Sequence, residues 1–161
     1  MTPWTGYAWV MSVSSVLRRE PAQLPPPIPE LYYHYRRPKL DEIDMGFAGR
    51  HGANHRMHHH LAALYPGDPL QACQTKQGRW ELLDQDRNRV GRLAKKFAAP
   101  PGTRCLSAKV FAIITRKREQ SGPDYQERIK CDTWEIVMPE LVFVPESLIA
   151  HIKKAFKLND Y

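Results

Sequence analysis

The stretch TWEIVMPELVF, residues 133–143, decides the fold, because it is the strongest run of strand-favouring residues in the chain. Pro139 lies in its middle and has no backbone N–H, so the stretch forms either two short strands or an edge strand with a bulge. Residues 106–116, LSAKVFAIITR, have a β-branched centre and predict a further strand. These two segments already indicate a mainly β protein.

Three shorter strands and two turns complete the predicted β structure. The strands are expected at residues 68–74, 79–83 and 89–93, and the turns at 76–78 and 84–88. Five short strands with close turns predict a small barrel of five or six strands, or a compact sandwich, over residues 67–145.

The segments on either side of this β domain differ in composition. Residues 1–30 end in a Pro-rich stretch, 21–29, which predicts an extended connector. Residues 31–66 form a Tyr- and His-rich arm that is partly helical, with a short helix across roughly residues 55–64. Residues 146–161 predict a closing amphipathic helix. Its N-cap would be Ser147, and its apolar face would hold Leu148, Ile149, Ile152 and Phe156.

The overall composition excludes several classes of protein. The chain has 161 residues, of which 42% are hydrophobic, so it is not disordered throughout. No apolar run approaches the roughly 20 residues of a membrane-spanning helix, and the first residues do not resemble a secretory signal. The three cysteines, Cys73, Cys105 and Cys131, are too few and too far apart for a disulfide framework or a metal knuckle. We therefore expect a reduced, cytoplasmic protein that does not bind membranes.

The net charge of +7 is concentrated in one window, residues 87–118, which contains ten Lys or Arg and no Asp or Glu. The rest of the chain therefore sums to −3. Such a window suits a surface that faces phosphates, because cations that displace condensed counterions gain binding free energy whatever the base sequence. A well-solvated basic surface without a ligand is the alternative. The phosphate contacts that we expect are Arg92, Lys95, Lys96, Arg104, Lys109, Arg116, Lys117 and Arg118.

Four aromatic residues lie near the basic window, and nucleic-acid bases stack on such flat side chains. Trp80 lies on a short strand and Phe97 begins a loop after two lysines, so both are candidates for stacking. Phe111 and Trp134 belong to apolar strand segments, and we expect them in the core.

The sequence contains few features that indicate metal binding or catalysis. His51, His55 and His59 have the spacing i, i+4, i+8, which on a helix would place three imidazoles on one face, as a zinc site needs. Gly52 disfavours that helix, so a polar helix face is the preferred interpretation. The chain has no nucleophile elbow, phosphate-binding loop or zinc-protease motif. We expect no metal, no cofactor and no enzymatic activity.

Several short motifs carry a resemblance to a known family. They are GDPL at residues 67–70, WELLD at 80–84, VGRLA at 90–94, and Phe97. In this order they resemble the small β module called HIRAN. Residues 128–137 and 139–143 are similar to the tail of some bacterial RecQ-type DNA helicases, which carry such a module as an accessory to the motor.

The resemblance covers residues 66–145 and implies an OB-like barrel that engages DNA at single strands or 3′ ends, attached to or cooperating with a helicase. The N-P-x-D-x-N-A stretch typical of these modules is absent, and residues 84–88, DQDRN, occupy the comparable turn. No 3′-end pocket residue is therefore carried over. The motor motifs are also absent, so the chain would be a detached accessory domain, a truncated fragment or a stand-alone relative.

We therefore predict an accessory domain that binds single-stranded or junction DNA alongside a helicase or repair protein, near the nucleoid. One rival is a protein-interaction module that docks through the C-terminal helix and the Tyr-rich arm. A second is an RNA-binding factor, because charge does not separate DNA from RNA and only contacts to the 2′-OH do so. A metal-dependent nuclease is the most distant, since it needs carboxylates that converge with the histidines.

Overall fold

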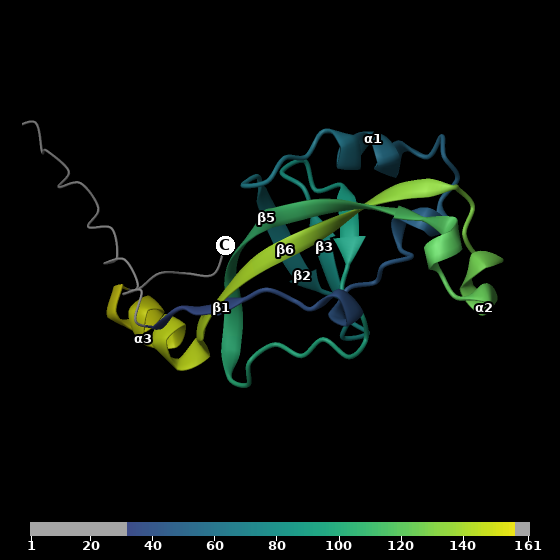
Figure 1. Cartoon of the computed structure of the whole chain (residues 1–161). Coiled ribbons are helices and arrows are strands. Elements are labelled where there is room, and N and C mark those ends of the chain that lie inside the picture. Colours follow the sequence, from purple (N-terminus) through teal and green to yellow (C-terminus); the bar gives the residue numbers. More distant parts are fainter. Residues whose placement is uncertain (1–31, 157–161) are drawn as a thin grey trace, which may run out of the picture.

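The computed structural model describes residues 32–156, shown as a coloured ribbon in Figure 1. The Pro-rich connector predicted at residues 21–29 lies outside the described residues, as do the rest of residues 1–31 and the last five residues of the predicted C-terminal helix.

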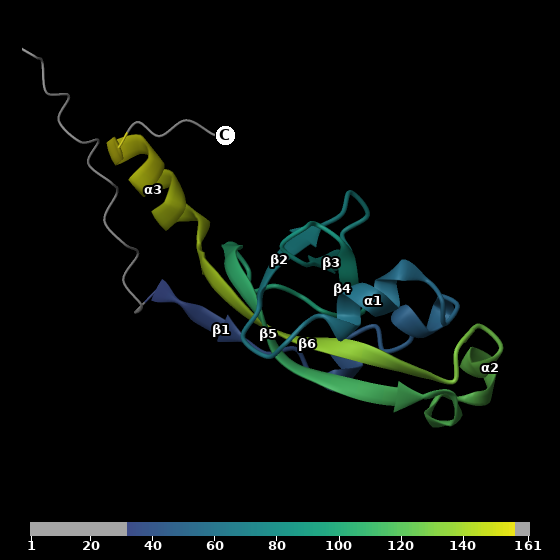
Figure 2. The ribbon, with the colours of Figure 1, turned by 90° about the horizontal axis from the view of Figure 1, so that it is seen from above.

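The described residues form one antiparallel sheet of six strands, in the order β1-β6-β5-β2-β3-β4. The sheet curls into a half-barrel (Figures 1 and 2). The mainly β prediction is therefore confirmed, while the OB-like arrangement that the resemblance implies stays a prediction. The strands are β1 (His34–Arg36), β2 (Pro69–Gln74), β3 (Trp80–Leu83), β4 (Arg89–Arg92), β5 (Thr103–Lys117) and β6 (Thr133–Pro145).

The long hairpin of β5 and β6 is the backbone of the sheet. The two strands stay paired from Thr103 opposite Pro145 to Lys117 opposite Thr133. The stretch around Pro139 is thus a single strand and not two, because the irregularity falls on the partner strand: β5 has a bulge next to Val110, the residue opposite Pro139. On its other side β6 pairs with β1 only at residues 141–143, so Pro139 lies beyond that ladder.

One stretch of chain serves both edges of the sheet. After pairing with β6 as strand β1, the chain passes through the 3₁₀ turn Leu40–Glu42 and reaches the outer edge of β4. There Ile43 forms a bridge with Leu93, and the Asp44 N–H donates to the Arg92 carbonyl at 2.9 Å. The edge of β4 is therefore partly covered, and Asp44 is held directly beside β4.

Residues 32–66 are part of the same body and not a separate arm. The predicted helix is present as α1 (Arg56–Ala62), and its Met57 and Leu61 are buried in the core. Ile43 and Phe47 join the same cluster as the strand residues, so the core spans the predicted boundary at residue 66. The reason is physical: these apolar side chains pack on strand residues that residues 67–145 alone would leave exposed to water.

Three further elements flank the sheet. The turn η3 (Ala48–Arg50) packs against β6, while η4 (Arg118–Gln120) and α2 (Pro123–Gln126) connect β5 to β6. The helix α3 (Glu146–Phe156) continues directly from β6 and projects from the body (Figure 2). Ser147 is the second residue of α3, so it is not the N-cap that we predicted. Within the described residues, no helix is long and apolar enough to cross a membrane.

Candidate nucleic-acid interface

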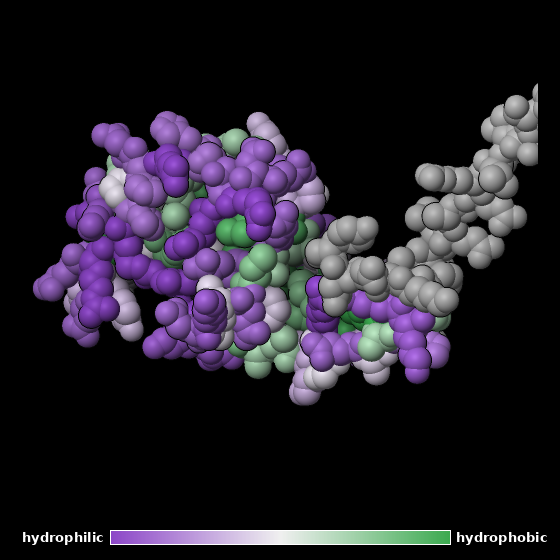
Figure 3. Space-filling view, turned by 180° about the vertical axis from the view of Figure 1, so that it is seen from behind, coloured by the Kyte–Doolittle hydropathy of each residue, from purple (hydrophilic) through white to green (hydrophobic). Residues whose placement is uncertain are grey.

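Residues from six segments of the chain line one open pocket with a volume of about 690 Å³. The pocket lies between the central part of the molecule and the η4–α2 connection, and its cationic side chains come from η3, β4, β5 and the loops. Seen from behind, the end of the molecule that carries α2 is covered by hydrophilic side chains (Figure 3). The cations are Arg50, Arg79, Arg92, Lys95, Arg116 and Arg128, and the carboxylate is that of Asp44.

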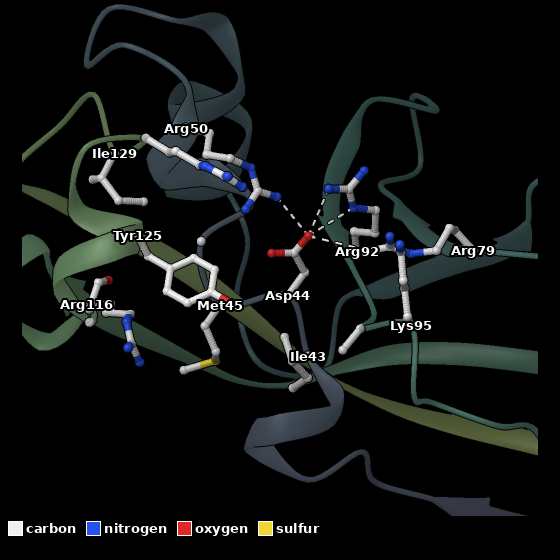
Figure 4. Close-up of a pocket in the computed structure, with 15 residues that line it drawn as sticks. Ile43, Asp44, Met45, Arg50, Arg79, Arg92, Lys95, Arg116, Tyr125 and Ile129 are labelled. Carbon is white, nitrogen blue, oxygen red and sulfur yellow. Dashed lines mark hydrogen bonds and ion pairs between the residues drawn. The ribbon is translucent and has the colours of Figure 1, made fainter. Parts of the chain in front are cut away.

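Asp44 organises three of these arginines around one oxygen atom (Figure 4). Its Oδ2 accepts hydrogen bonds from Arg50 at 2.7 Å and from the Nε and NH2 of Arg92 at 3.0 and 2.8 Å. The NH2 of Arg79 lies 3.6 Å from the same oxygen. The three guanidinium groups are therefore fixed by the fold before any ligand arrives.

The Asp44 carboxyl stays charged at physiological pH. Burial alone would raise its pKa, but the hydrogen bonds from Arg50 and Arg92, together with their positive charges, outweigh burial and hold the pKa below the ordinary value of 3.8. The site thus combines six cations with one anion, a net charge of +5.

Several cationic groups of the pocket have unused donors. In the part of the chain that the structure describes, neither Lys95 nor Arg128 has a carboxylate within 4.0 Å. The Nε atoms of Arg79 and Arg116 are buried and have no hydrogen-bond partner there. These two Nε atoms are closed to solvent, so the donors that an incoming anion can reach are those of the exposed Lys95 and Arg128.

One wall of the pocket is apolar and carries an aromatic ring. Tyr125 of α2 is 65% exposed, and it lines the pocket together with Ile129 and Met45 (Figure 4). Sequence reasoning missed Tyr125, and it also missed Arg50, Arg79 and Arg128. The only available signal was the sequence Gly-Pro before Tyr125, which begins a helix with proline at its first turn and presents the next residues at the surface.

Of the predicted phosphate contacts, the fold brings three to the pocket: Arg92, Lys95 and Arg116. Arg104 and Lys117 are exposed on β5 and do not line it. The cations of the 87–118 window therefore do not all converge on this pocket.

The other three predicted contacts are engaged with carboxylates elsewhere. Lys96 pairs with Asp41, and the Nζ of Lys109 lies 3.0 Å from Glu140, which also pairs with Arg37 at 2.6 Å. Arg118 faces Asp132 at 3.8 Å and donates to the Ile129 carbonyl at 2.9 Å.

The aromatic predictions need two corrections. Phe97 is only 6% exposed, because the turn after Ala94 folds it back onto the edge of Trp80, with ring centroids 6.2 Å apart, so it does not present a face for stacking. Phe111 is 44% exposed and not in the core, since it lies at the bulge of β5, where the guanidinium of Arg37 sits 4.0 Å from its ring. Trp80 is half-buried, and Trp134 is in the core as predicted.

The histidines do not share a helix face. The helix α1 begins at Arg56, and His55 caps it by accepting the Met57 N–H at Nδ1, so His51 lies outside the helix. The rings of His51 and His55 stack with centroids 4.4 Å apart. Among the residues 32–156 that the structure describes, no group of three or more His, Cys, Asp or Glu is arranged to hold a metal ion.

Comparison of the chain with protein-family models, with curated proteins and with solved structures finds no match.

Proposed function

We propose that this protein binds single-stranded nucleic acid, DNA in the first place, in the pocket around Asp44. The observation that carries the proposal is the convergence of six cationic side chains and one carboxylate in a single open pocket. Lys and Arg in such a number neutralise phosphates and release counterions, which is the main source of affinity for nucleic acids. In this arrangement phosphates contact Lys95, Arg116 and Arg128.

The apolar wall favours a nucleotide over a simple inorganic anion. A base stacked on an aromatic side chain contributes about 1–3 kcal/mol, and Tyr125 offers an exposed ring beside the cations. Single strands expose their base faces and duplexes do not, so the combination of Tyr125 with Arg128 and Arg116 is better suited to a single strand.

The proposal includes a role as an accessory to a DNA helicase or repair protein, in keeping with the HIRAN-like motifs of residues 67–97. The proposed activity is binding alone, with no chemical step. RNA is the second arm of every binding experiment, because the charges around Asp44 act on the phosphates of both nucleic acids alike.

Neighbouring lysines offer a matched test. Lys95 lines the pocket and has no carboxylate partner among residues 32–156, whereas Lys96 points to Asp41 outside it. Fluorescence anisotropy would follow the binding of labelled oligonucleotides by wild type, Lys95→Ala and Lys96→Ala at two salt concentrations. We expect Lys95→Ala to weaken single-strand binding roughly three- to tenfold at low salt and to reduce the salt slope by about 0.7. Lys96→Ala removes the same charge and should leave both quantities nearly unchanged.

The oligonucleotide set contains single-stranded DNA with free and blocked 3′ ends, duplex DNA and single-stranded RNA. Loss of binding on blocking the 3′ end would indicate that this protein, like HIRAN modules, has a pocket for the 3′ end of the strand. Equal losses for the two lysine variants would contradict the pocket, since net charge alone would then explain the binding. No binding to any oligonucleotide at low salt would contradict the proposed function.

A further inference from the structure

A second hollow, with a volume of about 500 Å³, opens next to the Asp44 pocket at the turn between β2 and β3. Four residues line it: Gln77, Gly78, Arg79 and Lys95. Arg79 and Lys95 also line the Asp44 pocket, so these two side chains border both hollows. In Figure 4 they lie toward one end of the pocket, and Tyr125 and Arg116 lie toward the other.

The lining of the second hollow differs in chemistry from that of the first. It has two cations, one amide side chain and one glycine, with neither a carboxylate nor an aromatic ring. Gly78 adopts a positive φ of 77°, and a Cβ placed there would have only the Nε2 of Gln74, at 3.9 Å, within van der Waals contact. The hollow is thus polar, and it is open at Gly78. Such a surface accommodates phosphate and sugar groups but offers nothing on which a base can stack.

Arg79 is fixed at the border of the two hollows. Its NH2 lies 3.6 Å from Asp44 on one side and donates to the Leu93 carbonyl at 3.4 Å on the other. Its Nε is buried and has no hydrogen-bond partner in the described part of the chain. Lys95 stands beside it as an exposed cation without a carboxylate partner among the described residues. Arg79 and Lys95 thus place two positive charges between the hollows, and a polyanion that extends from one hollow into the other contacts both.

We propose that the two hollows form one groove, in which the strand whose base lies on Tyr125 continues over Arg79 and Lys95 and places its sugar–phosphate backbone against the turn at Gln77. This inference rests on the proposed function and adds to it a second subsite that recognises the backbone and not the bases. Affinity should therefore increase with strand length beyond the nucleotides held at Asp44, and it should not depend on the bases that occupy the second hollow.

The experiment compares thymidine oligonucleotides of two and eight nucleotides, dT2 and dT8, in competition against a labelled single strand at about 150 mM salt. At this ionic strength charges are screened beyond about 8 Å, so distant effects are small. Gln77→Glu places a negative charge in the second hollow. Gln85→Glu makes the same change on the exposed β3–β4 turn, away from the groove, and controls for net charge. Arg128→Ala alters the Asp44 pocket alone.

We expect Gln77→Glu to weaken dT8 about threefold or more and to leave dT2 within twofold of wild type. Arg128→Ala should weaken both oligonucleotides, and Gln85→Glu should weaken neither. Among 8-mers that keep a single thymine at the 5′ end, the centre or the 3′ end and are abasic elsewhere, at least one should match dT8 within about twofold.

Two results would overturn the groove while leaving the proposed function intact: dT8 binding no better than dT2, or Gln77→Glu behaving like Gln85→Glu with both lengths. If every abasic 8-mer binds far more weakly than dT8, the second hollow reads bases and the inference is also wrong. Absence of binding at both lengths would overturn the proposed function and this inference with it.

Discussion

Replacing Asp44 with asparagine tests the centre of the site, because it keeps the shape of the side chain and removes its charge. The Asp44 side chain is only 14% exposed, and three guanidinium groups depend on its Oδ2. Hydrogen bonds to charged groups each contribute about 1.5–3 kcal/mol, and breaking a fully buried ion pair costs about 3–5 kcal/mol. The arginines reach solvent and can be hydrated, so we expect a loss of about 1–3 kcal/mol in the free energy of unfolding. For a chain of this size each kcal/mol corresponds to about 2–4 °C in Tm.

The effect should depend on pH in one direction. The pKa of Asp44 is lower in the folded protein than its ordinary value of 3.8, so the folded state favours the charged carboxylate. The stabilisation by Asp44 is therefore complete above the unfolded pKa, near pH 4, and is lost as the pH falls through the lower, folded pKa. The difference in unfolding free energy between wild type and Asp44→Asn should stay constant from pH 7 to about 5 and shrink below pH 4.

Urea unfolding followed by tryptophan fluorescence would measure this difference, because Trp134 is buried and donates to the Met45 carbonyl next to Asp44. Asp86→Asn is the control, since Asp86 is an exposed turn residue without an ion pair among the described residues, and its replacement should change stability by less than about 0.5 kcal/mol. Two results would refute the reasoning on Asp44. One is equal stability of Asp44→Asn and Asp86→Asn at pH 7, and the other is a stability difference between wild type and Asp44→Asn that grows as the pH falls.

Two further predictions concern packing and thiol chemistry. A Cβ on Gly49 would lie 2.8 Å from two ring atoms of the buried Trp134, so Gly49→Ala should destabilise the fold by about 1–3 kcal/mol in the same urea assay. A Cβ on Gly52 would have nothing within 4 Å, so Gly52→Ala should leave the stability nearly unchanged. Equal effects of the two substitutions would contradict the close packing at Gly49. Burial raises the pKa of Cys105 to about 11, so at pH 8 only about one Cys105 thiol in a thousand is ionised. A thiol-reactive dye should therefore label the exposed Cys73 much faster than Cys105, as mass spectrometry of the labelled peptides would measure. Labelling of Cys105 as fast as that of Cys73 would contradict this prediction.

The long strands could be predicted from the sequence, but β1 could not. Alternating and β-branched residues identify β5 and β6 because each is long enough to show its period. The strand β1 has only three residues, HYR, none of them aliphatic, so no hydrophobic period is present to reveal it. Ile43 and Phe47 were missed as core residues for a related reason: they lie in turns and bridges whose burial depends on the curl of the whole sheet.

The site was predicted in part because charge can be counted, while convergence cannot. Arg92, Lys95 and Arg116 stood out in the basic window and do line the pocket. Their partners Arg50 and Arg128 lie far from them in sequence and come close only through the pairing of β4 with the Asp44 segment and through the reversal at α2. The local sequence likewise does not show which cations are paired with carboxylates, as Lys96, Lys109 and Arg118 are in the structure.

A single carboxylate in a basic pocket helps a polyanion to bind, provided that it leaves donors free. Three guanidinium groups from separate segments repel one another, and without a common counter-charge they would turn outward into solvent. Asp44 holds them through one oxygen, using only the NH2 of Arg50 and one edge of Arg92. Each guanidinium carries five N–H donors in a rigid fork, so Arg50 and Arg92 keep donors that Asp44 does not use. A phosphate that binds them does not have to order three flexible side chains or break the Asp44 contacts, and the entropic cost of association falls accordingly.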